Sequence, residues 1–319
     1  MNSTPAVRVQ CHFDKTVLIR YFLFCLAVCL LMATHAAVPA MMASPPQSQQ
    51  GASLNIPKLI RDMAWNELQA SEHPAHYYRY INRDVSPGGS RTTEQIGTPQ
   101  GIAELLLSVN GKPPTAQQRE KNDRFLARLA TDVRFQQSRL KDQRQDTRRR
   151  NSVIKNLPKA FIFTLLGRTK DGFIHLKFRP DPNFQPSSRQ ASVLEGMAGE
   201  LWVDPSSQRM VKVDGTLIKD VTIGWGFLAR LYKGGRFLME QSKGPGGTWH
   251  QELLSVDFDG SILIFKSLHI HEKEIRCCFE KVPDNLTIAE AVEMLRRETA
   301  LPEHWRSILD AIEKWNGSY

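Results

Sequence analysis

Near the end of the chain, the segment His269-Ile270-His271-Glu272 has residue types and a spacing that suit metal binding. Side chains alternate between the two faces of a strand, so His269 and His271 would share one face and could both reach one ion. The sequence offers no third ligand at a matching spacing. We therefore predict that both histidines face solvent, and we expect no bound metal and no cofactor.

Other sequence signals of catalysis are weak. The HExxH, GxSxG and GxGxxG patterns and the phosphate-binding loop are all absent. Gly244-Pro245-Gly246-Gly247 lacks the lysine and hydroxyl residue of a phosphate loop, so it predicts a hairpin loop. His73 and His76 flank a proline near an expected helix end, where a loop or capping role is the default. We therefore expect a protein that is not an enzyme.

The first forty residues have the order of segments found in a secretory signal. Basic residues precede an uncharged apolar run, Tyr21–Met32, and Val38-Pro39-Ala40 follows as a cleavage site. The run is short for a membrane span, so we expect cleavage and export. Two alternatives anchor the protein in a membrane: an uncleaved signal, or a lipid on Cys29 after the lipoprotein-like sequence Leu26-Ala27-Val28.

Cleavage near Ala40 would leave only two of the five cysteines, Cys277 and Cys278. Neighbouring residues of a strand point to opposite faces, so we expect these side chains to lie apart and no disulfide framework to form. Stability must then come from the core. The formal charge of +9 favours anionic partners, lipid head groups among them.

Apolar periodicity divides the rest of the chain into helices and short strands. Helices are expected at Ile56–Ala70, at Thr115–Arg150 and, split at Pro302, at Ile288–Trp315. Strands are expected at Tyr77–Val85, Thr92–Ile96, Ile102–Val109, Ala160–Leu166, Phe173–Phe178, in a hairpin at residues 199–217, and at Ile218–Trp225, Arg236–Gln241, Thr248–Phe258 and Ile262–Phe279. Short strands with frequent turns predict an antiparallel sheet and a mainly β protein of the α+β class.

One face of this sheet is expected to be apolar, and such a face must be covered. The helices supply only a partial cover, so we predict a large curved antiparallel sheet that forms an incomplete β-barrel with a helical lid. An apolar cavity would then lie inside it; simple packing of the same side chains is the alternative. The residues expected to line the cavity are Leu201, Val203, Val211, Val213, Leu217, Phe237, Met239, Val256 and Phe258.

A family resemblance supports this architecture. Leu201-Trp202-Val203-Asp204-Pro205, followed by Arg209-Met210-Val211-Lys212-Val213, resembles the strand, Asp-Pro turn and strand of periplasmic outer-membrane lipoprotein-sorting proteins of the LolA/LolB-like superfamily. Trp225-Gly226-Phe227, residues 236–240 and residues 263–266 continue the resemblance, which covers about Tyr77–Phe279. It implies a periplasmic half-barrel with an apolar concave surface and a helical lid, which holds acyl chains without catalysis. The long helix at 115–150 and the C-terminal helices depart from the family pattern.

The expected organisation has four parts: a signal peptide at residues 1–40, a flexible lead-in at 41–53, a half-barrel domain at 54–282 with a helical insertion at about 115–157, and a C-terminal helical extension at 283–319. The leading hypothesis is an exported carrier that binds the acyl chains of a lipid or lipoprotein. The alternative is an envelope interaction or sensor module, in which the C-terminal helices offer a docking surface to another protein.

The basic helix at Thr115–Arg150 would lie over the mouth of the cavity, with Phe125, Leu129 and Val133 facing inward. Guanidinium groups there would bind a phosphate or carboxylate head group or a membrane surface, and a solvated helix face is the alternative. The expected rim residues are Arg124, Arg128, Arg139, Trp202 and Trp225. We expect no nucleic-acid partner, because the protein is expected to be exported and no aromatic residues interleave the arginines.

Overall fold

A computed structural model describes residues 54–223, 229–262 and 266–297. The expected signal peptide with Cys29, the lead-in expected at residues 41–53, Trp225 and the helix expected after Pro302 lie outside the described residues. All described residues belong to one compact unit. Its helices are α2 (Ile56–Glu72), α3 (Ala116–Thr131), α4 (Val133–Ala160) and α5 (Ile288–Arg297), with two short 3-10 turns, η2 (Gln190–Gly196) and η3 (Pro245–Gly247).

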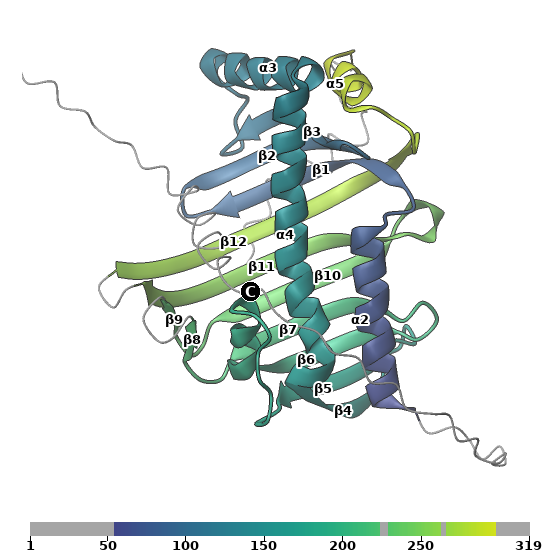
Figure 1. The fold of residues 1–319 in the computed structure, drawn as a ribbon, viewed down its shortest axis with the longest axis vertical. Helices are drawn as coiled ribbons and strands as arrows, with labels where there is room; N and C mark the ends of the chain where they lie inside the picture. Colours follow the sequence, from purple (N-terminus) through teal and green to yellow (C-terminus); the bar gives the residue numbers. More distant parts are fainter. Residues whose placement is uncertain (1–53, 224–228, 263–265, 298–319) are drawn as a thin grey trace, which may run out of the picture. The chain divides into compact units, whose positions relative to one another are not determined.

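Twelve strands form one antiparallel sheet (Figure 1). They are β1 (Tyr77–Ser86), β2 (Gly89–Thr98), β3 (Gly101–Val109), β4 (Phe161–Arg168), β5 (Ile174–Pro180), β6 (Met197–Asp204), β7 (Arg209–Leu217), β8 (Val221–Ile223), β9 (Ala229–Leu231), β10 (Arg236–Lys243), β11 (Trp249–Ile262) and β12 (Lys266–Val282). Their order is β3-β2-β1-β12-β11-β10-β7-β6-β5-β4; off this path, β9 pairs with β11 and β8 pairs with β9. β3 and β4 do not pair, so the sheet stays open, and the predicted fold class is confirmed.

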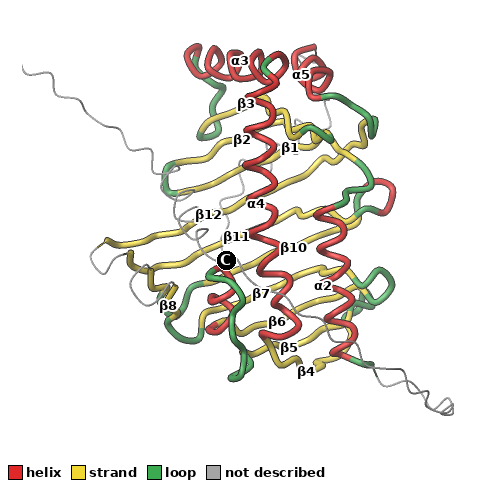
Figure 2. The backbone as a smooth tube through the Cα atoms, in the orientation of Figure 1, coloured by secondary structure: helices red, strands yellow, loops and turns green. Residues whose placement is uncertain are grey.

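Helices α2 and α4 cross the same face of the sheet, and α3 and α5 lie at its β3 end (Figure 2). α4 has 28 residues and runs across most of the strands. Among the described residues, none of the helices combines the length and apolar character needed to cross a membrane.

The single helix expected at Thr115–Arg150 is two helices, because Asp132 ends one and begins the next. Its backbone N–H donates to the carbonyl of Arg128 at 2.8 Å, and its carboxylate accepts from the N–H of Phe135 at 3.0 Å. A carboxylate that accepts from the first turn is a strong N-cap. α4 then continues past Arg148-Arg149-Arg150 to Ala160, so the expectation that these arginines end a helix is wrong.

The corner at the β3 end has its own apolar core. It consists of Ile96, Ala103, Leu126, Leu129, Val282, Leu286, Ile288, Ala291, Val292 and Leu295. α3 therefore buries its apolar side against α5 and the sheet. Val133, at the start of α4, is 60% exposed. The expectation that Leu129 and Val133 face inward over an apolar cavity is wrong, since one lies in the corner core and the other in solvent.

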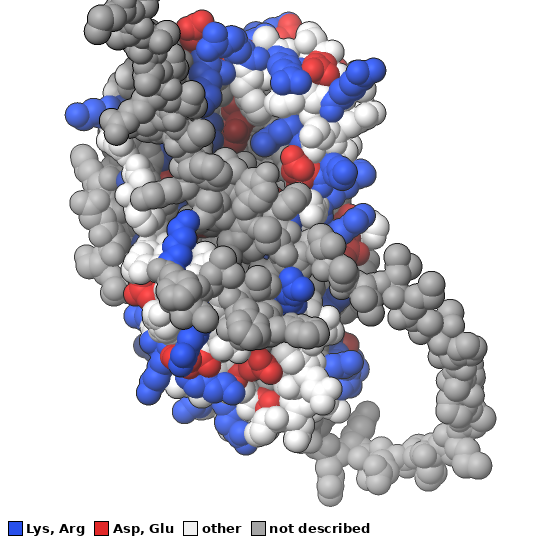
Figure 3. Space-filling view, turned by 60° about the vertical axis from the view of Figure 1, so that its left-hand side comes forward, with Lys and Arg blue, Asp and Glu red and all other residues white. Residues whose placement is uncertain are grey.

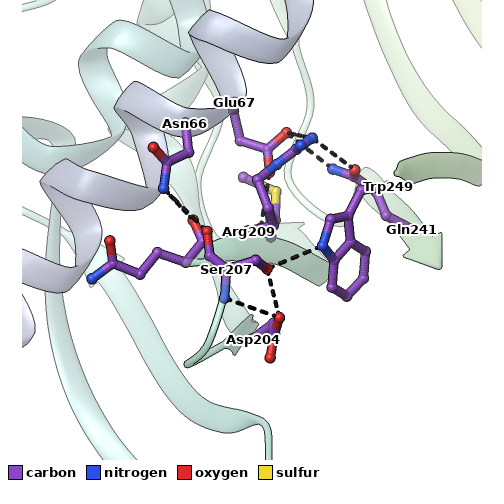
Figure 4. Close-up of polar contacts among 9 residues, drawn as sticks. Asn66, Glu67, Asp204, Ser207, Arg209, Gln241 and Trp249 are labelled. Carbon is purple, nitrogen blue, oxygen red and sulfur yellow. Dashed lines mark hydrogen bonds and ion pairs between the residues drawn. The ribbon is translucent and has the colours of Figure 1, made fainter. Parts of the chain in front are cut away.

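At the other end, Glu67 of α2 anchors that helix to the sheet (Figure 4). Its carboxylate is buried and accepts from Arg209 Nε at 2.8 Å, Arg209 Nη2 at 3.0 Å, the N–H of Met210 at 2.9 Å and Gln241 Nε2 at 3.2 Å. One α2 carboxylate thus fixes β7 and β10 together. Buried charges need such paired, hydrogen-bonded surroundings.

The Asp-Pro turn between β6 and β7 is built around the Asp204 carboxylate. It accepts from Ser206 Oγ at 2.7 Å and from the N–H of Ser207 at 3.2 Å, and it pairs with Lys243 Nζ at 3.2 Å. Burial raises the pKa of Asp204, but the hydrogen bonds from Ser207, Ser206 and Lys243 outweigh burial and hold the pKa well below its usual range. Trp249 Nε1 completes the turn by donating to Ser207 Oγ at 3.0 Å (Figure 4).

Candidate functional site

Side chains directly opposite each other on paired strands share a face of the sheet. One such row crosses eight strands through Leu176, Leu201, Val213, Met239, Leu254, Glu274, Asp84 and Arg91. A second row runs through Phe178, Gly199, Gly215, Phe237, Val256 and Glu272. Both rows change from apolar to charged between β11 and β12. We call the part on β5, β6, β7, β10 and β11 the apolar half of the face, and the part on β12, β1 and β2 the charged half.

Helices α2 and α4 cover this face (Figure 2). Leu176 and Leu201, in the first row, are at most 3% exposed. Their strand neighbours His175 and Trp202 are only half-buried and stack on each other, with ring centroids 4.4 Å apart. Trp202 therefore lies on the outer face, contrary to the rim position expected from the sequence.

The nine residues expected to line a cavity differ in accessibility. Leu201, Val203, Leu217 and Phe258 are buried. Val213, Phe237, Met239 and Val256 keep part of their surface accessible, as does Val211 in a bulge between β6 and β7. The accessible apolar surface is thus centred on β7, β10 and β11, at the border with the charged half.

The charged half is organised around Arg276 of β12. Its Nε donates to Glu274 Oε1 at 2.9 Å and to Asn82 Oδ1 at 3.3 Å, and its guanidinium carbon lies 5.7 Å from the Tyr80 ring centroid. Asp84 keeps accessible surface, yet desolvation by the surrounding protein and the negative charge of Glu274 raise its pKa. The charged half therefore holds cationic and anionic groups in close contact.

Arg150 brings a further charge to this region from α4. Desolvation by the surrounding protein lowers the pKa of its guanidinium, the positive charge of Arg276 lowers it further, and the negative charge of Glu274 opposes both effects. Arg150 as a whole residue nevertheless keeps exposed surface. From the sequence, Arg150 is expected only at a helix end, because linear spacing does not reveal that α4 crosses the sheet.

The arginines expected at the rim lie elsewhere, on α3 and the first turns of α4. Arg124 pairs with Glu120 at 3.0 Å, and Arg128 pairs with Asp132 at 3.0 Å. The guanidinium of Arg139 lies 5.5 Å from the Phe125 ring centroid. These three residues belong to the α3–α4 corner, and the structure does not bring them to the apolar half.

A hollow of about 310 Å³ lies beside β5 and is separate from the apolar half. It is lined by Arg179, Pro180, Asp181, Pro182, Phe184, Glu195, Ile218 and Lys219. None of the nine residues expected to line a cavity contributes to it. Lys and Arg side chains are spread over several parts of the face seen in Figure 3, with smaller groups of Asp and Glu among them.

Cys277 and Cys278 do not point apart as expected. Their Sγ atoms lie 2.6 Å from each other, because Cys278 adopts a φ of 62° at the point where the register of β1 and β12 shifts. A residue in this bulge breaks the alternation on which the expectation depended. The hydrogen bond between the two sulfurs raises the pKa of Cys277 and lowers that of Cys278.

His250 occupies an aromatic setting at the start of β11. Its ring stacks on Phe279 with centroids 4.1 Å apart and meets the edge of Tyr78 at 4.4 Å. Among the described residues, its Nε2 atom has no hydrogen-bond partner. Desolvation, helped by the positive charge of Arg209, lowers the pKa of His250 to about 4.

This shift predicts a loss of stability in acid. The fold holds His250 neutral, so its contribution is complete above the unfolded pKa near 6.5 and is lost as pH falls towards 4. The expected loss is about 3 kcal/mol. Urea unfolding at pH 7, 5.5 and 4 should show a smaller decline for His250→Phe, which stays neutral, and an unchanged decline for the exposed control His73→Gln. Equal declines in all three proteins would contradict the assignment.

Comparisons with protein-family models and with curated proteins gave no match.

Proposed function

We propose that this protein is a non-enzymatic carrier of an amphipathic lipid or of the acyl chains of a lipoprotein. The observation that carries the proposal is the change from apolar to charged residues between β11 and β12 on the helix-covered face. An acyl chain would lie on the accessible apolar residues Val213, Phe237, Met239 and Val256. Burial of a chain contributes about 0.8 kcal/mol for each methylene group.

The head group would lie towards the charged half. Arg150 of α4 and Arg276 of β12 are close enough for the charge of Arg276 to lower the pKa of Arg150, and guanidinium groups bind phosphate or carboxylate through paired hydrogen bonds. Glu274 already accepts from Arg276, so Arg150, which keeps exposed surface, is the better candidate for contact with an anion. Export by the N-terminal segment, most simply to the periplasm, is part of the same proposal.

Two neighbouring residues of β10 allow a matched test. Met239 lies on the helix-covered face, and Leu238 lies on the opposite face with similar partial burial. We expect Met239→Glu in the full chain to weaken binding of a fluorescent fatty acid at least tenfold, because it places a carboxylate against the acyl chain. Leu238→Glu should change the affinity less than twofold.

The proposal fails if the wild-type chain binds no fluorescent fatty acid and native mass spectrometry of protein from a membrane-containing lysate shows no bound lipid. Equal losses in the two β10 variants would also contradict it, since the loss would then follow from general destabilisation. Circular dichroism of each variant, recorded before the titration, identifies that case.

The interaction-module alternative depended on the C-terminal helices. α5 packs Ile288, Ala291, Val292 and Leu295 into the corner core, with none of them more than 2% exposed. This burial favours a structural role for α5 over a docking role. Trp305 and Trp315, the other expected docking residues, lie outside the described residues.

A further inference from the structure

Two histidines of β12 meet two aspartates of β11 on the outer face of the sheet. The antiparallel register places Asp259 opposite His269 and Asp257 opposite His271. His269 Nδ1 lies 2.6 Å from Asp259 Oδ1, and His271 Nδ1 lies 2.6 Å from Asp257 Oδ1. The two imidazole rings are nearly parallel, at 13°. All four side chains are exposed, so the solvent-facing position predicted for the histidines is confirmed.

Asp259 supplies the third ligand that the sequence did not reveal. Its Oδ1 atom lies 2.6 Å from His269 Nδ1 and 3.5 Å from His271 Nε2, and the ligating atoms of the three residues all lie within 4.8 Å of one another. Ligands about 2.0–2.2 Å from a tetrahedral zinc ion are themselves about 3.3–3.5 Å apart. Small side-chain rotations would therefore bring the three groups around one ion.

Asp257 has the position of an orienting residue. It contacts Nδ1 of His271, which leaves Nε2 of the same ring directed towards Asp259. In metal sites, a ligating histidine usually donates its other ring N–H to a carboxylate, which fixes the tautomer and the ring orientation. His271 thus contacts both Asp257 and Asp259, an arrangement that two separate exposed ion pairs would not require.

We propose that His269, His271 and Asp259 form a binding site for a divalent transition-metal ion such as Zn²⁺, with Asp257 orienting His271. Imidazole and carboxylate ligands suit Zn²⁺, Ni²⁺ or Cu²⁺, whereas Ca²⁺ and Mg²⁺ prefer oxygen ligands alone. Exposure of the cluster leaves room for water in a fourth position. The site lies on the face opposite the apolar half, so this inference is independent of lipid binding.

Isothermal titration of the untagged full chain with ZnCl₂ tests the proposal, with MgCl₂ as the oxygen-preferring comparison. We expect zinc to bind and magnesium not to bind. His271→Gln removes a ligand and should weaken zinc binding at least tenfold. Asp257→Asn removes the orienting carboxylate and should weaken it about 10–100-fold.

The matched control is His73→Gln, which removes an exposed histidine outside the cluster and should leave the zinc affinity unchanged. An absence of zinc binding to the wild-type chain would overturn the proposal. Undiminished zinc binding by His271→Gln would also overturn it, because the ion would then be held elsewhere, for example by the adjacent cysteines. Because the site is on the surface, circular dichroism should report the same fold for all three variants.

Discussion

Replacing Glu67 by alanine should lower the free energy of unfolding by about 3–5 kcal/mol, the usual cost of removing one partner from a buried ion pair. Glu67 is 7% exposed and accepts hydrogen bonds from Arg209, Met210 and Gln241. Without it, the half-buried Arg209 guanidinium would lose its charged partner, and the Met210 N–H and Gln241 Nε2 would lose their acceptor. Urea unfolding followed by circular dichroism measures the change.

Asp62, one turn earlier on α2, offers a matched control. It pairs with Lys58 at the surface, where solvent screens the interaction. Asp62→Ala should therefore shift the urea midpoint far less than Glu67→Ala. Similar shifts would mean that Glu67 does not anchor α2 to β7 and β10.

The second large effect is expected in the corner core, where Leu126→Ala should cost about 2–5 kcal/mol. The side chain of Leu126, on α3, is fully buried in the corner core against α5 and the sheet. Its truncation therefore leaves a cavity and also removes apolar contacts. In urea unfolding, Leu126→Ala should lower the midpoint concentration and leave the m-value unchanged.

Val133→Ala is the comparison, because Val133 lies only two turns further along the chain and is 60% exposed. We expect it to change stability by less than about 0.5 kcal/mol. If Val133→Ala were the more damaging variant, α3 and α4 would have to pack the opposite way, with Val133 inward as the sequence had suggested.

The fold class followed from the sequence because its signals are local. Alternating apolar residues and turn sequences such as Asp204-Pro205 specify strands and hairpins without knowledge of distant partners. The break at Asp132 was missed, because the surrounding segment lacks glycine and proline, and an aspartate in a polar helix gives little indication that it caps a second helix. The bulge at Cys278 was missed for a similar reason, since nothing in its neighbours requires a positive φ.

The division of the sheet face and the metal cluster depend on strand pairing between distant segments. Along β12, Ile270 is followed on the same face by Glu272 and Glu274. The sequence alone therefore shows that this strand changes from apolar to charged. Only the register reveals that Glu274 continues the apolar row of Leu254. The same register brings Asp259 to His269 across ten residues, so a search for ligands by linear spacing could not identify it.

The two ends of the strand order, β3 and β4, are open edges, which in principle invite another chain to add a strand. At the β3 edge, Asn122 of α3 imitates a neighbouring strand: its Oδ1 accepts from the N–H of Leu106 at 3.0 Å, and its Nδ2 donates to the carbonyl of Glu104 at 3.2 Å. At the β4 edge, Leu166 is a bulge without a register partner in β5, and Gly167 has a φ of 145°.

Bulges bend an edge strand away from the flat geometry that intermolecular pairing needs. This matters at β4, where Leu165 and Leu166 are 45% and 49% exposed. A straight edge with these two leucines would be prone to self-association and fibril growth. The irregular end of β4 thus protects an open sheet from aggregation, a task that a closed barrel would not have.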